Sequence, residues 1–127
     1  MFGPITIPYE SKMLYNVVKL KNGISMEDVE LKLGELCETV KETYRDEGGF
    51  IAGQAFKFSG FVSEEGSLDS ENKSEEHIAI ITYWKSFEQH EKSHADPTFK
   101  GHFKELMDMC DDAYEIGYDL LWQGVPE

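Results

Sequence analysis

The chain has 127 residues, of which 40% are hydrophobic and 13% aromatic, enough to build one domain over residues 1–127 around a single core. Its formal net charge of −13 argues against a nucleic-acid partner and against an anionic membrane surface, because both require clustered Lys and Arg. No stretch approaches the roughly 18 apolar residues of a membrane span. Cys37 and Cys110 are expected to be free thiols, and we expect a cytoplasmic protein.

The first half of the chain predicts an irregular arm over residues 1–11 and a strand over residues 12–21, where Val, Leu and Tyr alternate with other side chains. Apolar residues then recur at helical spacing over residues 26–46, and Gly48-Gly49 ends this predicted helix. A long aromatic stretch over residues 50–62 predicts the second strand.

The second half begins with residues 63–76, which are acidic, polar and free of aromatic side chains, so we expect a loop. The stretch "HIAIITYW", residues 77–84, is the strongest strand signal in the chain. A short helix follows Ser86 and ends at Asp96-Pro97, where a longer helix begins. Alternating aromatic and aliphatic residues over 113–122 predict the last strand.

This order, β-α-β-β-α-β, predicts an α+β fold of the ferredoxin-like type with an antiparallel sheet. Right-handed crossovers place the helices on one face of such a sheet. The first strand is apolar on both faces, with Tyr15 and Val17 on one and Leu14 and Val18 on the other. One apolar face therefore stays uncovered, which predicts a homodimer joined through the sheets.

The segment His90–His94 spells H-E-x-x-H, the spacing with which two histidines on a helix bind zinc in metallopeptidases. The surrounding sequence is unlike a peptidase site, because the host helix is short and charged and the downstream candidates for a third ligand are only His102 and Glu105. We therefore expect a solvated helix with both histidines mostly on its outer side, and no bound metal.

The longer stretch "YWKSFEQHEKSHADPTFKGHFKEL", residues 83–106, resembles the second half of the antibiotic-biosynthesis-monooxygenase family. The resemblance implies a dimeric α/β barrel with a ligand cavity between helices and sheet. Members of this family include cofactor-free oxygenases of quinols and polycyclic aromatics, haem-degrading enzymes, and proteins with no known activity. Asn16 matches an asparagine of the haem-degrading branch, but Ser93 and Phe103 replace its tryptophan and histidine.

The leading hypothesis is a cofactor-independent monooxygenase for a hydrophobic, aromatic or quinol-type molecule. An aliphatic strand face makes Asn16 a candidate for stabilising an anion, and a histidine can take up a proton near pH 7. The expected catalytic residues are Asn16, His94 and His102, and the expected substrate-binding residues are Tyr83, Trp84, Phe99 and Phe103. The alternatives are a non-catalytic binding or stress-response dimer with its cavity packed shut, and a haem-binding protein.

Overall fold

A computed structural model describes residues 3–69 and 76–126, so part of the expected acidic loop, residues 70–75, lies outside the described residues. In chain order its elements are β1 (Lys12–Leu20), α1 (Met26–Tyr44), the 3-10 turn η1 (Asp46–Gly48), β2 (Phe50–Lys57), β3 (Phe61–Val62), β4 (Leu68–Asp69), β5 (His77–Trp84), α2 (Phe87–Ala95), α3 (Pro97–Asp108) and β6 (Cys110–Asp119).

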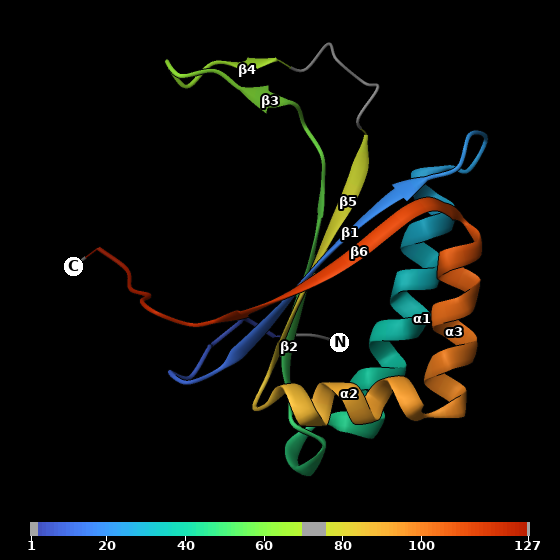
Figure 1. Ribbon diagram of the computed structural model, residues 1–127, viewed down its shortest axis with the longest axis vertical. Helices are drawn as coiled ribbons and strands as arrows, with labels where there is room; N and C mark the ends of the chain where they lie inside the picture. Colours follow the sequence, from blue (N-terminus) through green and yellow to red (C-terminus); the bar gives the residue numbers. More distant parts are fainter. Residues whose placement is uncertain (1–2, 70–75, 127) are drawn as a thin grey trace.

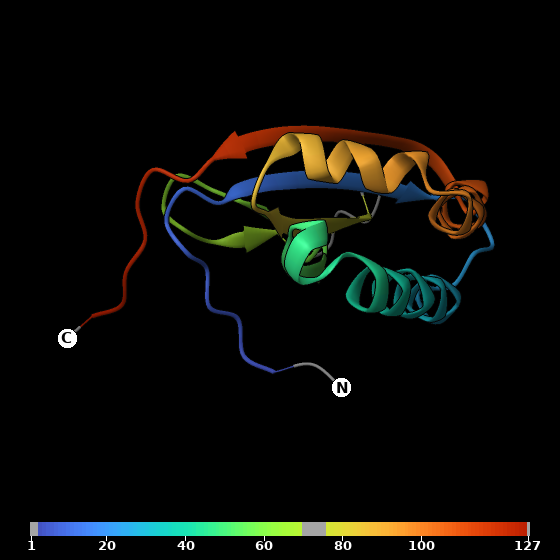
Figure 2. The same cartoon turned by 90° about the horizontal axis from the view of Figure 1, so that it is seen from below.

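The main sheet is antiparallel with the strand order β2-β5-β1-β6, which is the ferredoxin-like arrangement predicted from the sequence. The prediction of the fold class is confirmed. Helices α1 and α3 lie side by side along the sheet, and α2 crosses near one end of it (Figure 1). The same arrangement, turned by 90°, appears in Figure 2. No helix of the described ranges is long and apolar enough to cross a membrane.

Each helix begins at a residue that the sequence marks as a cap. Ser25, Ser86 and Asp96 accept hydrogen bonds from backbone N–H groups in the first turns of α1, α2 and α3. Pro97 occupies the first turn of α3, where a missing N–H group does no harm. These caps fix α2 and α3 as two separate helices joined at Asp96.

The core lies between the sheet and the helices. Its buried apolar side chains are Val18, Val29, Leu33, Ile78, Leu106 and Cys110 in one cluster and Leu14, Val40, Trp84 and Phe99 in the other. Because side chains alternate along a strand, the buried positions Leu14 and Val18 identify the face of β1 that meets the helices. Asn16 shares that face.

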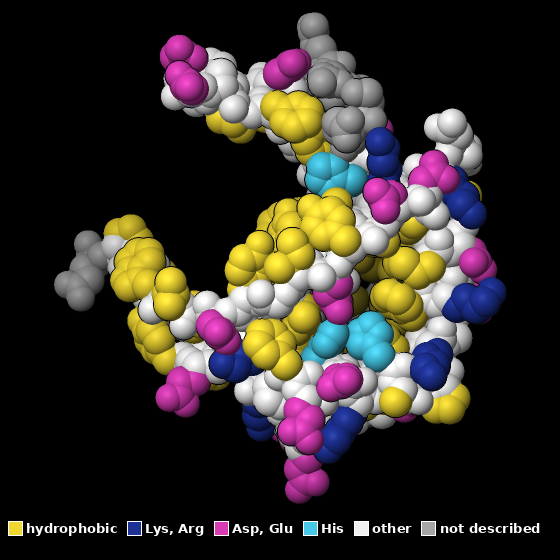
Figure 3. Space-filling model, viewed as in Figure 1, with side chains coloured by type: hydrophobic (Ala, Val, Ile, Leu, Met, Phe, Trp, Pro, Cys, Tyr) yellow, Lys and Arg dark blue, Asp and Glu magenta, His cyan; other side chains and the backbone are white. Residues whose placement is uncertain are grey.

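The other face of the sheet is not covered by the described part of the chain. Three cross-strand rows form it: Phe56, Ala79, Val17 and Tyr114; Gln54, Ile81, Tyr15 and Ile116; Ala52, Tyr83, Met13 and Tyr118. Phe56, Tyr114, Ile116 and Tyr118 are between 42% and 53% exposed. Hydrophobic side chains gather along the sheet on this side in Figure 3.

Two strand boundaries differ from the prediction. Strand β2 ends at Lys57 rather than near residue 62, and residues 61–62 and 68–69 pair as a small hairpin within the segment expected to be strand and loop. Strand β6 covers residues 110–119 instead of 113–122. Trp122 therefore lies beyond the strand, in a tail that extends away from the sheet in Figure 1.

Candidate functional site

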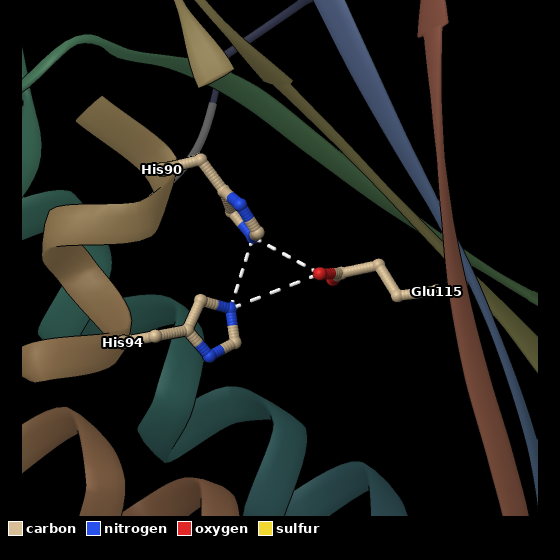
Figure 4. A group of neighbouring side chains, drawn as sticks. All are labelled: His90, His94 and Glu115. Carbon is tan, nitrogen blue, oxygen red and sulfur yellow. Dashed lines mark hydrogen bonds and ion pairs between the residues drawn. The ribbon is translucent and has the colours of Figure 1, made fainter. Parts of the chain in front are cut away.

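Helix α2 carries His90 and His94 one turn apart, so both rings lie on the same side of the helix. That side faces the sheet (Figure 4). The Nε2 atoms of the two rings are 3.0 Å apart, and the side chains are 13% and 32% exposed. The prediction that these histidines lie mostly on the outer side of a solvated helix is wrong.

Strand β6 brings Glu115 to the same point. Its Oε1 atom lies 3.4 Å from Nε2 of His90 and 3.9 Å from Nε2 of His94, as the dashed lines in Figure 4 show. Glu115 is the cross-strand neighbour of Asn16 on β1, so both project from the helix-facing side of the sheet. The Asn16 side chain hydrogen-bonds to the Glu115 carboxylate, and its Nδ2 lies 3.4 Å from the carbonyl oxygen of Ile80.

Aromatic rings hold the two imidazoles in place. Trp84 meets the His90 ring edge-on, with 5.3 Å between ring centroids. Phe99 and Phe103 meet the His94 ring in the same manner at 5.0 and 5.3 Å. Side chains wedged in this way have few other rotamers available, so the polar groups are oriented before any ligand binds.

A cavity of about 140 Å³ lies between the three helices and the sheet, with Asn16, His90, His94 and Glu115 in its lining. Most of the remaining lining is aliphatic or aromatic, with contributions from α1, α3, β2 and β5. Figure 3 shows a hollow lined by hydrophobic side chains, with histidine and acidic side chains beside it. The cavity is therefore mostly apolar, and its histidine and acidic side chains, His90, His94 and Glu115, lie together in one corner beside Asn16.

Charge in this corner is set by burial and by the neighbouring groups. Burial alone would raise the pKa of Glu115, but the hydrogen bond from His90, the charges of both histidines and the bond from Asn16 outweigh it and lower that pKa. Burial, helped by the charge of His90, lowers the pKa of His94 against the opposing effect of Glu115. Near pH 7 Glu115 is ionised and His94 is neutral, so this corner can accept a proton.

Five of the seven residues expected at the site line this cavity, namely Asn16, Trp84, His94, Phe99 and Phe103. The structure does not bring the other two to it. Nδ1 of His102 on α3 lies 3.7 Å from the Glu35 carboxylate and, among the described residues, has no hydrogen-bond partner. Tyr83 projects from the open face of the sheet and donates a hydrogen bond to the Gln54 side chain at 3.1 Å.

Sequence reasoning missed His90 and Glu115 as members of the site. A signal for Glu115 exists in the alternation of β6, where Tyr114, Ile116 and Tyr118 occupy the open face. The intervening position, Glu115, must then face the helices. A carboxylate there, beside Asn16, requires a partner because burying an unpaired charge is unfavourable. His90 is that partner.

Many solved structures show the same arrangement of elements, and three of them illustrate its range. One is SnoaB, a cofactor-independent oxygenase from Streptomyces nogalater, with a TM-score of 0.66 and 13% identity over 93% of this chain and 99% of that chain. Another is a protein described as an antibiotic biosynthesis monooxygenase from Bacteroides thetaiotaomicron, with a TM-score of 0.62 and 15% identity over 93% of this chain and 96% of that chain. The third is a hydroxynitrile lyase from Passiflora edulis, with a TM-score of 0.66 and 10% identity over 93% of this chain and 100% of that chain.

This chain has the fold of the antibiotic-biosynthesis-monooxygenase family. The resemblance expected from residues 83–106 is thus confirmed at the level of the fold. No protein-family profile matches the sequence, and no curated protein sequence matches it significantly. Because an oxygenase and a lyase share the fold, the fold does not determine the reaction, which depends on the residues of the site.

Proposed function

We propose that the protein is a homodimeric enzyme of the oxygenase type that binds a small aromatic hydroxy compound in the cavity and oxidises it with dioxygen. The observation that carries the proposal is the open, mostly apolar cavity in which Asn16, His90, His94 and Glu115 form a polar corner. An apolar wall recognises the ring, and the polar corner recognises a hydroxyl group on it. A packed dimer without a ligand would need neither feature.

The size of the cavity narrows the substrate class. Apolar cavities of roughly 150 Å³ hold one benzene-sized molecule, and the volume here is about 140 Å³. The cavity therefore favours a single ring, such as a phenol or hydroquinone, over the polycyclic substrates of some members of the resembled family. The cavity is also far smaller than a haem group. Its size therefore does not favour the alternative of a haem-binding protein.

The polar corner suits removal of a proton from the bound hydroxyl. In the metal-free cluster a neutral imidazole beside an ionised carboxylate accepts that proton. The Asn16 amide exchanges its long 3.4 Å hydrogen bond to the Ile80 carbonyl for one to the phenolate oxygen that results. The electron-rich phenolate then reacts with dioxygen. One atom of dioxygen replaces the hydrogen on a ring carbon and becomes a carbonyl oxygen of the quinone product. The other atom leaves as water with the two hydrogens that the phenol loses, one from its hydroxyl group and one from the ring. Dioxygen is the oxidant and takes up the electrons that the ring gives up.

The open face of the sheet supports the proposed homodimer. Three half-exposed aromatic rings, Phe56, Tyr114 and Tyr118, each leave on the order of 100 Å² in water, and covering each contributes roughly 2.5 kcal/mol. A tail carrying Leu121, Trp122 and Val125, with exposures of 79% or more, extends away from its own subunit in Figure 1 and could lie on a partner. A second copy of this chain would present a matching apolar face.

A binding experiment tests the proposal with a matched pair of ligands. Phenol and toluene have similar size, but only phenol offers a hydroxyl group to the polar corner. We expect calorimetry to show tighter binding of phenol by wild type, and Asn16→Leu to reduce that preference about tenfold, the effect of losing one hydrogen bond. His102→Ala is the control, because His102 lies outside the cavity lining.

Turnover is tested separately by oxygen consumption with phenols and hydroquinones. We expect wild type and His102→Ala to consume oxygen and His94→Ala to lose at least tenfold in rate. Binding without consumption by wild type would favour the non-catalytic binding dimer. Binding of neither ligand would contradict the proposed substrate class.

A further inference from the structure

We infer that His90, His94 and Glu115 bind a divalent transition-metal ion, with the unfilled coordination positions facing the cavity. The three side chains come from two different elements, α2 and β6, yet one ligand atom of each points at the same small volume (Figure 4). Two imidazole nitrogens and one carboxylate oxygen form a common ligand set for such ions in proteins.

The distances between the ligand atoms match those around a metal ion. Ligand atoms bound at about 2.1 Å lie roughly 3.0 Å apart at right angles and roughly 3.4 Å apart in a tetrahedron. The two Nε2 atoms are 3.0 Å apart, and Oε1 of Glu115 is 3.4 Å from His90. The third side, 3.9 Å to His94, needs to shorten by only about 0.5 Å, which a rotation of the Glu115 carboxylate provides.

The surroundings keep the ligands in this geometry. Asn16 hydrogen-bonds to the Glu115 carboxylate, and Trp84 and Phe99 pack against the edges of the two imidazoles. Outer-shell contacts of this kind orient metal ligands and raise affinity. Two histidines and one carboxylate with open positions are the ligand set of non-haem Fe(II) oxygenases and of catalytic zinc sites, so Fe(II) and Zn(II) are the ions that this site fits.

A second group of ligand-type side chains shows what an unsuitable cluster looks like. Glu35, His102 and Glu105 also approach one another, on the outer surfaces of α1 and α3. There the Lys32 ammonium pairs with both carboxylates and already supplies the positive charge that a metal ion would bring. By contrast, no lysine or arginine of residues 3–69 and 76–126 lines the cavity in which the His90–His94–Glu115 cluster lies.

This inference revises the expectation, drawn from the sequence, that the H-E-x-x-H spacing binds no metal. That expectation assumed histidines on an outer face and only His102 or Glu105 as a third ligand, whereas both rings face inward and β6 supplies Glu115. Use of the metal in catalysis rests on the proposed function: a hydroxyl group bound at an open position would lose its proton more readily beside the ion. The metal site itself does not depend on the identity of the substrate.

Metal binding is measured with Co(II), whose visible absorption reports its coordination, in the absence of any aromatic ligand. Apo-protein is incubated with excess Co(II) and gel-filtered, and its metal content is determined. We expect wild type to retain one Co(II) per chain, and apo-protein to take up Fe(II), added without oxygen, in the same ratio. His94→Ala and the near-isosteric Glu115→Gln should bind at least 100-fold more weakly while keeping the far-ultraviolet circular dichroism of wild type.

His102→Ala is the control and should bind Co(II) as wild type does. Retention of no metal by wild type would overturn the inference, as would undiminished binding by the folded His94 and Glu115 variants or loss of binding in the His102 variant. Should those variants fail to fold, paramagnetic shifts in wild type decide: Co(II) must shift the ring protons of His90 and His94, and shifts confined to His102 contradict the site. None of these results depends on phenol binding, so the two proposals can fail independently.

Discussion

Ile81 lies in the middle row of the open sheet face, on an inner strand between Gln54 and Tyr15. In the proposed homodimer an aspartate at this position would be buried against the partner sheet without a positive charge beside it. An unpaired buried charge costs about 3–5 kcal/mol, and a two-fold interface contains it twice. Ile81→Asp should therefore weaken association by roughly 6–10 kcal/mol, a factor of about 10⁴ to 10⁷.

Analytical ultracentrifugation at micromolar concentration measures this effect directly. We expect wild type to sediment as a dimer and Ile81→Asp as a folded monomer. Leu31→Asp is the matched control, because Leu31 is an apolar residue on α1 that is 72% exposed and lies away from the sheet face. A wild-type monomer would contradict the proposed homodimer. So would an Ile81→Asp variant that remains dimeric, or a Leu31→Asp variant that is monomeric.

Three further predictions concern stability. Leu106→Ala should lower the free energy of unfolding by 2–5 kcal/mol in urea denaturation, about the usual cost of truncating a buried leucine. Tyr44→Phe should cause a smaller loss in the same assay, because it removes only the 2.5 Å hydrogen bond from the Tyr44 hydroxyl to Asp96 between α1 and α3. The hydrogen bond from Lys32 lowers the pKa of Glu105 in the folded protein below its ordinary value of 4.5. The stability that this bond contributes is therefore complete above pH 4.5 and is lost as the pH falls through the lowered pKa of the folded protein. The melting temperature of Glu105→Gln should therefore lie slightly below that of wild type near neutral pH and converge with it in acid.

The order of elements and the faces of the strands could be predicted because period-two and helical patterns are local properties of the sequence. The ends of the strands could not be predicted in this way, because each end is set by the length of the partner strand. β6 stops at Asp119 because its neighbour β1 begins opposite it at Lys12, although the alternating sequence continues to Trp122. β2 stops at Lys57 for the same reason, opposite the start of β5.

The site was predictable where one residue conflicted with its neighbours. Asn16 stood out among aliphatic residues, and the structure places it in the cavity lining. The inward orientation of His90 and His94 was missed because α2 has a weak apolar pattern. Its inner face is formed by these histidines and the fully buried Ser93. Such a face is recognised as buried only once the tertiary structure shows what packs against it.

The central claim is that the cavity holds a small aromatic molecule. Native mass spectrometry of the protein purified from its own source tests it most directly. We expect a dimer that carries one small aromatic compound per chain. A Val40→Phe variant should lose this compound because the larger side chain fills the cavity that Val40 lines. A dimer without any bound compound, which also fails to take up added phenol, would contradict the claim.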